Sequence, residues 1–254
     1  MKASPGFTAL ALAAIAVVGC GRVSSPTAPL TTSPTLTNVV AAKAAYDPVI
    51  IPADFSSTID NPLLPLLRGT VWRYRMADGS QTNTVTVTND RKTVMGIRVA
   101  VVHDQVFTNG VLSEDTFDWY AQHKDGTVWY FGEDTRELDP FGNVITTQGS
   151  WEAGVNGGKP GILMLAHPKV GDSYRQEFMP GVVADMGKVL SLTSTASVPA
   201  GNFTDCLETV EWTPLEPGNR ANKFYARGIG PVLELSNHGR AERLELVSFE
   251  PPRH

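Results

Sequence analysis

The chain of 254 residues has little of the chemistry that most enzymes use, with two cysteines and five histidines. The histidines are scattered, and none falls at the HxH or HExxH spacing of a zinc site; they are His103, His123, His167, His238 and His254. The chain also lacks the G-x-S-x-G elbow of many hydrolases and the glycine fingerprint of dinucleotide-binding folds. These absences argue against zinc, serine-hydrolase and dinucleotide-dependent enzymes.

Basic charge is also scarce, because 21 Lys and Arg residues stand against 26 Asp and Glu residues, a net charge of −5. Loss of an N-terminal segment that contains Lys2 takes the net charge to −6. Binding to nucleic acid depends on clustered basic side chains that neutralise phosphates. We therefore expect no nucleic-acid partner.

The N-terminus has the layout of a secretory signal, since Lys2 precedes an apolar run over residues 9–18 that is too short to span a bilayer. The tetrapeptide Val17-Val18-Gly19-Cys20 resembles the lipobox of bacterial lipoproteins, in which cleavage precedes the cysteine and the cysteine is acylated. The resemblance implies a signal peptide over residues 1–19, palmitate or a similar lipid on Cys20, and a membrane-anchored protein of the cell envelope that faces the periplasm or the exterior. The alternative is an ordinary signal peptide with an incidental cysteine.

Composition divides the remaining chain in two. Residues 20–57 begin with a stretch rich in Ser, Thr, Pro and Ala, which predicts a flexible tether and lead-in. Residues 58–254 then form a single β-rich domain. If Cys20 is acylated, Cys206 is the only thiol left and no internal disulfide can form. Cys206 lies among apolar residues, and we expect it to be buried.

Short alternating segments separated by turn residues run through this domain. Residues 82–88 alternate Thr with Asn or Val, the period of a half-buried strand, and residues 94–101 are apolar enough for a strand covered on both faces. The glycine-rich stretch 153–161 lacks the spacing of a phosphate loop and reads as a plain turn. These patterns predict an all-β fold, an antiparallel meander of roughly 10–12 strands curled into an open barrel or half-barrel.

Two motifs in the C-terminal third carry a second resemblance. Val198-Pro199-Ala200-Gly201-Asn202-Phe203 and Tyr225-Ala226-Arg227-Gly228-Ile229-Gly230-Pro231-Val232 are similar to the VPAG-F and YAPGVG-V segments of uncharacterised bacterial secreted and lipid-anchored β-rich proteins. Here Arg227 replaces the usual proline and Pro231 an apolar residue. The resemblance implies an open barrel and transfers no catalytic residue.

The stretch 112–151 is the central unit of the chain, with Asp125-Gly126 between two aromatic segments. That dipeptide predicts a two-residue type I′ hairpin turn. The resulting register pairs Lys124 with Thr127, Gln122 with Trp129, Tyr120 with Phe131, and Asp118 with Glu133.

Acidic residues gather at the open end of this hairpin. The simplest interpretation is structural: a solvated sheet edge whose charges discourage aggregation. One functional alternative is a cation site, with calcium as the candidate ion and four carboxylates as ligands: Asp115, Asp118, Glu133 and Asp134. Another is a hydrolase that uses Asp118 and Glu133 as an acid pair on an envelope or extracellular substrate.

The rings on the same predicted face, Tyr120, Trp129 and Phe131, suggest a ligand-binding surface. The favoured function is a lipid-anchored, non-enzymatic module that binds an apolar ligand or another envelope protein. A structural envelope protein without a ligand is the remaining alternative. No catalytic residue and no obligatory cofactor is assigned.

Overall fold

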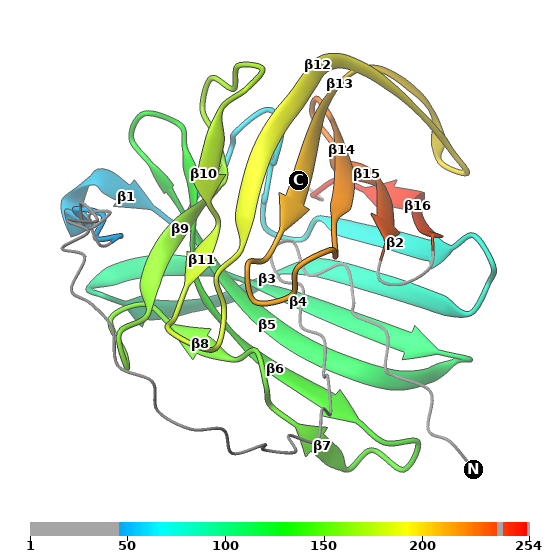
Figure 1. The fold of residues 1–254 in the computed structure, drawn as a ribbon, viewed down its shortest axis with the longest axis horizontal. Coiled ribbons are helices and arrows are strands. Elements are labelled where there is room, and N and C mark those ends of the chain that lie inside the picture. Colours follow the sequence, from blue (N-terminus) through cyan, green and yellow to red (C-terminus); the bar gives the residue numbers. More distant parts are fainter. Residues whose placement is uncertain (1–45, 238–240, 253–254) are drawn as a thin grey trace, which may run out of the picture.

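Figure 1 shows the computed structural model, which describes residues 46–237 and 241–252. The expected signal peptide and the lipobox with Cys20 lie outside these residues. Apart from a 3-10 turn, η1 (Pro52–Asp54), the described segments are built from strands. No helix in them is long and apolar enough to cross a membrane.

The predicted all-β fold is confirmed, because the strands join one sheet of 16 members with antiparallel pairing. The count exceeds the predicted 10–12 because several members have only two or three residues. The strands are β1 (Phe55–Ser56), β2 (Val71–Met76), β3 (Gln81–Val94), β4 (Ile97–Thr108), β5 (Val111–His123), β6 (Val128–Leu138), β7 (Val144–Thr146), β8 (Trp151–Glu152), β9 (Lys159–Met164), β10 (Ser173–Arg175), β11 (Glu177–Phe178), β12 (Met186–Val198), β13 (Gly201–Trp212), β14 (Ala221–Ala226), β15 (Gly230–Asn237) and β16 (Ala241–Glu250).

The sheet curls into a nearly closed barrel whose two edges meet at one short stretch, 173–178. Its first half, β10, pairs with β12 at one edge, and its second half, β11, pairs with β9 at the other. Between them lies Gln176, which is buried and whose backbone N–H donates to the Asp185 carbonyl at 2.8 Å. A Cβ on Gly161 would lie 2.1 Å from the Gln176 carbonyl oxygen, so only glycine permits this approach.

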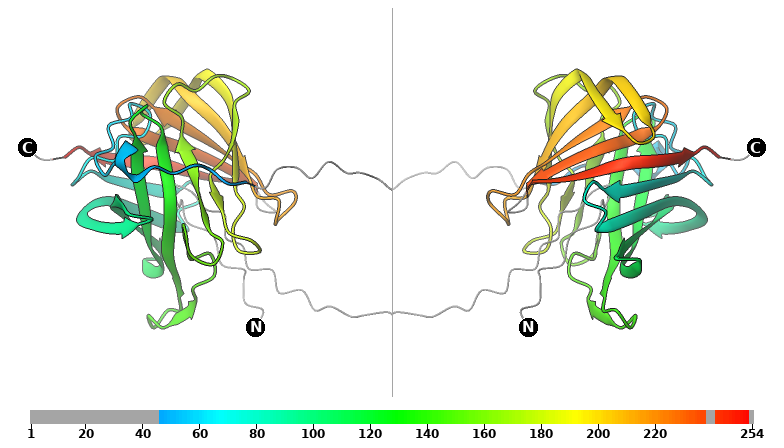
Figure 2. Two further views of the ribbon diagram at one scale, coloured as in Figure 1. Left: turned by 90° about the vertical axis from the view of Figure 1, so that its left-hand side faces the viewer. Right: turned by 90° about the vertical axis from the view of Figure 1, so that its right-hand side faces the viewer.

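On the far side of the barrel the last strand pairs with the first long one. β16 lies beside β2, as the side views in Figure 2 show. The Trp72 indole N–H donates to the Ile229 carbonyl at 2.7 Å, and the Gly228 N–H donates to the Pro62 carbonyl, also at 2.7 Å. The Arg227-to-Pro231 turn of the second motif therefore packs against Trp72 and the segment that precedes β2.

The central hairpin is present, but its predicted two-residue turn is wrong. His123 and Thr127 close a three-residue loop, because the His123 N–H donates to the Thr127 carbonyl and the Gly126 N–H donates to the His123 carbonyl. Only Gly126 in that loop has a positive φ, of 94°. A type I′ turn would need two such residues.

A β-bulge farther along the hairpin cancels this shift. Tyr120 pairs with Tyr130 instead of Phe131, yet Asp118 pairs with Glu133 as predicted, because the register shifts between these two positions. Gly132 lies at the bulge with a φ of 132°, and a Cβ there would lie 2.3 Å from the Trp151 carbonyl oxygen. The bulge is thus fixed in place by a residue that cannot be exchanged.

Contacts with the barrel begin earlier than the predicted boundary at residue 58. The Tyr46 hydroxyl donates to the Pro160 carbonyl at 2.7 Å, and Phe55 pairs with His123 through β1. Part of the expected lead-in, 46–57, is therefore packed on the domain. Cys206 is a buried free thiol in the core, as predicted.

Candidate functional site

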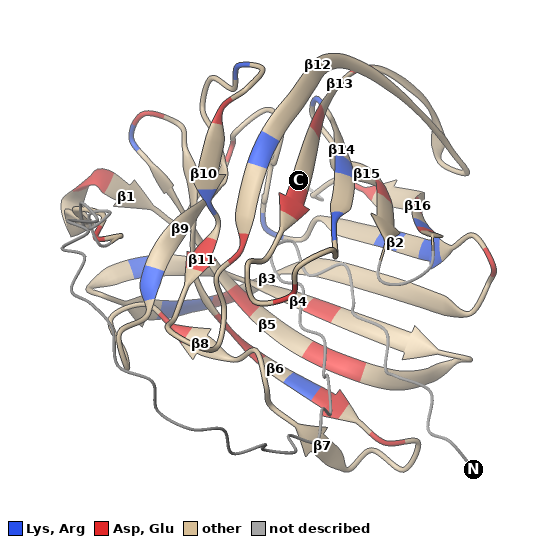
Figure 3. Cartoon of the chain, viewed as in Figure 1, with Lys and Arg blue, Asp and Glu red and all other residues tan. Residues whose placement is uncertain are grey.

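Carboxyl groups line the inner face of the curved sheet. They come from neighbouring strands, Asp104 on β4, Asp118 on β5 and Glu133 on β6, whose acidic positions Figure 3 marks. Glu177 on β11 and Asp185 in the loop before β12 extend the series. We call these five residues the acid row. All are between 0 and 4% exposed.

Alternation of the strands places these residues inward. Val85, Asp104 and Thr116 share one cross-strand level of β3, β4 and β5, and all three are buried. Asp118 lies two residues beyond Thr116 and therefore points to the same side as Asp104. Glu133, directly opposite Asp118, does too.

The acid row contains oxygen atoms that no hydrogen bond satisfies in the described part of the chain. The Asn83 amide donates to Asp104 Oδ1 at 2.7 Å, and the Tyr130 hydroxyl donates to Asp118 Oδ1 at 2.7 Å. The buried oxygens without a hydrogen bond of normal geometry are Asp104 Oδ2, Asp118 Oδ2, Glu133 Oε1, and Glu177 Oε1 and Oε2. Besides the Asn83 amide, the donors that act on these carboxyls are the Tyr120 and Tyr130 hydroxyls and the Trp151 indole N–H. Buried polar atoms are normally paired, so this group points to an unfilled role.

Burial moves the acid row toward the neutral form. It is the largest cause that raises the pKa of Asp118, to about 7. Burial, and then the neighbouring Asp118 carboxyl, raises the pKa of Glu133 and of Asp104 well above the usual range. Burial, followed by the carboxyls of Asp185 and Glu133, does the same for Glu177. The row therefore holds protons that an ionised ligand could displace.

The opposite side of the interior is compensated. Lys223 on β14 is the one buried Lys or Arg among residues 46–237 and 241–252. Its Nζ lies 2.7 Å from Glu211 Oε2 and 4.0 Å from Glu234 Oε2. We call these three residues the lysine cluster. Burial alone lowers the pKa of Lys223, but the two carboxylates outweigh it, and the pKa is raised.

The two groups face one another across the barrel. Although burial dominates the raised pKa values of Asp104 and Asp118, the charge of Lys223 acts against it at both sites. Lys223 comes from β14, several strands away in the sheet. The interior is therefore one electrostatic unit with an excess of acid.

The four carboxylates predicted as calcium ligands are not brought together. Asp118 and Glu133 point inward, whereas Asp115 and Asp134 alternate with them and lie on the outer face. There the Asp115 carboxylate contacts His103 at 2.7 Å, and Asp134 pairs with Arg136 at 2.8 Å. Among the residues that the structure describes, no three His, Cys, Asp or Glu side chains are grouped to hold a metal ion.

The predicted aromatic surface is also divided. Tyr120 lies inside, stacked on Tyr130 with ring centroids 4.8 Å apart. Trp129 and Phe131 instead pack edge-on against Phe55, at 6.1 and 5.5 Å. The three-residue turn accounts for this, since it moves Trp129 to the other face of the hairpin.

A groove at the edge of β6 reaches the acid row. This edge groove has a volume of about 340 Å³, and Glu133 and Trp151 line it together with Asp134 and Glu152. Its one cation, Lys92, is paired with Glu152 at 2.7 Å and lies 3.2 Å from the ring centroid of Trp119. The groove is therefore acidic where it meets the interior.

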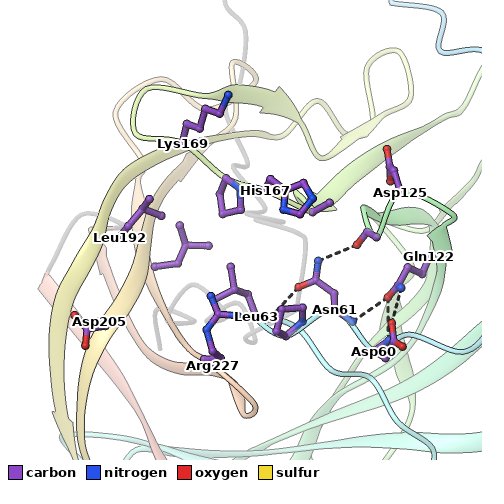
Figure 4. A pocket seen from close by; sticks show the side chains of 15 residues that line it. Asp60, Asn61, Leu63, Gln122, Asp125, His167, Lys169, Leu192, Asp205 and Arg227 are labelled. Atoms are coloured by element: carbon purple, nitrogen blue, oxygen red, sulfur yellow. Dashed lines mark hydrogen bonds between the residues drawn. The ribbon is translucent and has the colours of Figure 1, made fainter.

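A larger pocket of about 530 Å³ lies at one end of the barrel, shown in Figure 4. It lies between the segment before β2, the turn of the central hairpin and the β12–β13 hairpin. Asn61 holds this end together, because its amide donates to the Gly126 carbonyl at 2.9 Å and to the Leu165 carbonyl at 3.3 Å. The charged side chains that line this pocket are exposed and carry both signs; they include Lys169, Arg227 and Asp205.

The sequence analysis did not identify five residues of the barrel interior as site residues: Asp104, Tyr130, Glu177, Asp185 and Lys223. Asp104 was detectable as a carboxylate within an apolar strand, and Lys223 as a lysine between small and aromatic residues. A charge at an inward position of an alternating strand is the common signal. Glu177 and Asp185 lie in irregular segments and give no such signal.

No protein-family profile matches the chain, and no curated protein matches it. Solved structures with some likeness include a protein named as exported, with a YmcC-like fold, from Bacteroides fragilis NCTC 9343. It is 15% identical with a TM-score of 0.43, and the match covers 74% of this chain and 99% of that one. Another is a protein named as a lipoprotein from Parabacteroides distasonis ATCC 8503, 11% identical with a TM-score of 0.41, over 75% of this chain and 99% of that one. Likeness at this level carries no argument about function.

Proposed function

We propose that this chain is a lipid-anchored protein of the bacterial cell envelope that binds a positively charged ligand inside its barrel and catalyses no reaction. The anchor rests on the Val17-Val18-Gly19-Cys20 motif, which lies outside the described residues. The ligand rests on one observation, the acid row with its unpartnered oxygens. The cationic ligand replaces the apolar one that the aromatic pattern suggested.

The energetic argument is that buried charge needs compensation. An isolated ionised carboxylate costs at least several kcal/mol to bury, so uncompensated acids must stay protonated or meet a cation. The lysine cluster shows the protein's own solution to this problem on one side of the interior. The acid row has four carboxyls without a described ion-pair partner: Asp104, Asp118, Glu133 and Glu177. A cation from outside the described chain supplies the missing charge.

Hydrolysis by Asp118 and Glu133 is the other candidate. In its favour, the two carboxyls face each other and burial raises the pKa of Asp118 to about 7. Against it, Asp118 is fully buried and Glu133 is 3% exposed, which leaves no open cleft between them for a polymer. Retaining or inverting hydrolysis needs both carboxyls to flank a bound substrate bond.

The binding proposal is tested on full-length protein purified from its own membranes in detergent. Native mass spectrometry should detect a retained cation, and titration with added cations at pH 8 should give a binding signal that Glu133→Gln/Glu177→Gln abolishes. Glu250→Gln, an exposed partner of Arg73, is the matched control. Binding that survives in the double variant would place the ligand elsewhere.

The anchor is tested separately with Cys20→Ser. The variant should leave the membrane fraction or remain unprocessed, because acyl chains on this residue would hold the protein to the bilayer. Unchanged fractionation with no lipid mass on the N-terminal peptide would refute the anchor and leave the binding site untouched.

A further inference from the structure

We infer that the ligand of the acid row is a linear aliphatic polyamine, with ammonium groups separated by short methylene chains. The inference rests on the proposed binding function and adds the chemical class of the ligand. It follows from the shape of the row, its aromatic surroundings and the groove that leads to it.

The carboxyls are arranged in a line across the strands. Asp118 and Glu133 are direct cross-strand partners, which places their Cβ atoms about 4.5 to 5.5 Å apart. Asp104 is diagonal to Asp118, a spacing of roughly 7 to 8 Å. Glu177 feels the charges of both Asp185 and Glu133 and so continues the line beyond β6.

A line of this kind suits an extended cation better than a compact one. Calcium requires six or more oxygens that converge at about 2.3 to 2.6 Å, whereas the described residues contain no such convergence. Ammonium groups separated by three or four methylenes lie roughly 5 to 6 Å apart in an extended chain. That repeat is close to the direct cross-strand spacing of Asp118 and Glu133.

The surroundings provide for the apolar part of such a ligand. Tyr120 and Tyr130 are stacked beside Asp118, and Trp151 packs edge-on against Tyr130 with ring centroids 5.4 Å apart. Ring faces attract ammonium groups and accept methylenes without a desolvation penalty. Carboxylates with rings beside them therefore match both halves of the polyamine repeat.

The edge groove provides a route of the same sign. Asp134 and Glu152 lie at its surface, and Glu133 and Trp151 belong to both the groove and the interior. These two surface acids are paired with Arg136 and Lys92, so an elongated cation engages them with one end by competing with those side chains, while its other end reaches Glu133. Acidic lining also concentrates cations at the entrance.

The test is calorimetric titration of the full-length protein in detergent at pH 8 with butylamine, putrescine and spermidine, which carry one, two and three ammonium groups. Affinity should rise at least about tenfold per ammonium, the gain expected of one charge-assisted hydrogen bond. In Glu133→Gln/Glu177→Gln, spermidine should bind no better than butylamine. Glu250→Gln should match the wild type.

A second readout, proton release on binding, uses the wild type alone and therefore does not depend on whether the double variant folds. At pH 7, spermidine should release protons from the wild type, detected as a binding heat that depends on the ionisation enthalpy of the buffer. Equal affinity for all three amines, or no proton release, would overturn the polyamine. Calcium binding that depends on Glu133 and Glu177 would overturn it too, yet keep the proposed function. If no cation binds in a way that depends on Glu133 and Glu177, both the polyamine and the proposed function are overturned.

Discussion

The two sides of the barrel interior bury the same kind of residue in opposite ways. In the lysine cluster, Glu211 and Glu234 surround Lys223, and the Tyr225 hydroxyl adds a bond to Glu211 at 3.3 Å. In the acid row, Asp118 and Glu133 face each other, and a tyrosine hydroxyl supplies the described bond to Asp118. One side is a network around an internal cation, although Glu234 Oε2 lies 4.0 Å from Lys223 Nζ and has no hydrogen bond of its own. The other is complete only when protons or a ligand are added.

The comparison teaches that burial of charge does not by itself mark a functional site. A buried ion pair can be replaced by apolar residues with little loss, so the lysine cluster has a structural explanation. The acid row has none within the described chain, because four of its carboxyls have no described ion-pair partner: Asp104, Asp118, Glu133 and Glu177. The presence of an internal cation on one side, rather than burial of charge, separates the two.

The largest effect is expected on the compensated side. Lys223→Met leaves Glu211 and Glu234 buried without their cation and should lower the free energy of unfolding by about 3 to 5 kcal/mol. Urea denaturation measures it. Lys159→Met, whose exposed partner is Asp47, should cost no more than about 1 kcal/mol. Equal effects would mean that the lysine cluster is not a closed network.

The acid row should make the ligand-free protein less stable as pH rises. The folded pKa of Asp118 is about 7 and its ordinary value 3.8, so between these values the folded state binds a proton that the unfolded state lacks. Stability is then full at low pH and falls toward pH 7 by up to about 4 kcal/mol. Thermal denaturation from pH 4.5 to 8 measures the decline.

Asp118→Asn should flatten this decline in part, since Glu234, whose pKa burial also raises to about 7, contributes with the same sign. The groups that act on Asp118 are Asp104, Glu133, Glu177, Lys223 and the two tyrosines beside it. A wild-type protein that gains stability from pH 5 to 8 would contradict a protonated acid row.

The same substitution on the two sides should give different results. Glu211→Gln weakens the partner of Lys223 and should cost about 2 to 3 kcal/mol at pH 8. Glu177→Gln removes an acid that has no described ion-pair partner and should be neutral or stabilising, by no more than about 1 kcal/mol. Chemical denaturation of both variants decides this, and a larger loss for Glu177→Gln would reverse the assignment of the two sides.

Hydroxyl deletion provides the smallest test. Tyr130→Phe removes the 2.7 Å bond to Asp118 and should cost about 1 to 1.5 kcal/mol, whereas Tyr225→Phe removes a 3.3 Å bond and should cost less than about 1 kcal/mol. Tyr130→Phe should also raise the pKa of Asp118 further, because the lost bond favours its ionised form. Carboxyl titration by NMR would show an unchanged Asp118 if that bond were unimportant.

The fold was predictable because most strands alternate. Residues 82–88 have the expected alternating burial in β3. The single strand predicted over residues 94–101 is wrong, because Met95 and Gly96 have positive φ and form the turn between β3 and β4. The closure at Gln176 was not predictable, since it depends on two short strands with no periodicity of their own. The loop length at Asp125-Gly126 was predicted wrongly because this dipeptide suits both two- and three-residue loops. The predicted pairing of Asp118 with Glu133 is nevertheless right, because the bulge at Gly132 shifts the register back.

The site was predictable only in part. The opposition of Asp118 and Glu133 followed from the hairpin, but its position inside the barrel did not, because the outer face of these strands is partly apolar as well. Glu177 and Lys223 join the interior through strands far away in the chain. Local pattern cannot specify which distant charges will meet.

The pairing of β2 with β16 has a consequence for how the protein folds. Trp72 and Tyr74 on β2 bond to carbonyls 157 residues farther along the chain. Contacts between residues so far apart are slow to form, because a long loop must first be closed. While the chain is being made, β2 presents an unpaired edge until the C-terminal strand arrives, and such edges are prone to aggregation. Successful maturation therefore depends on protecting the nascent chain until its final strand emerges.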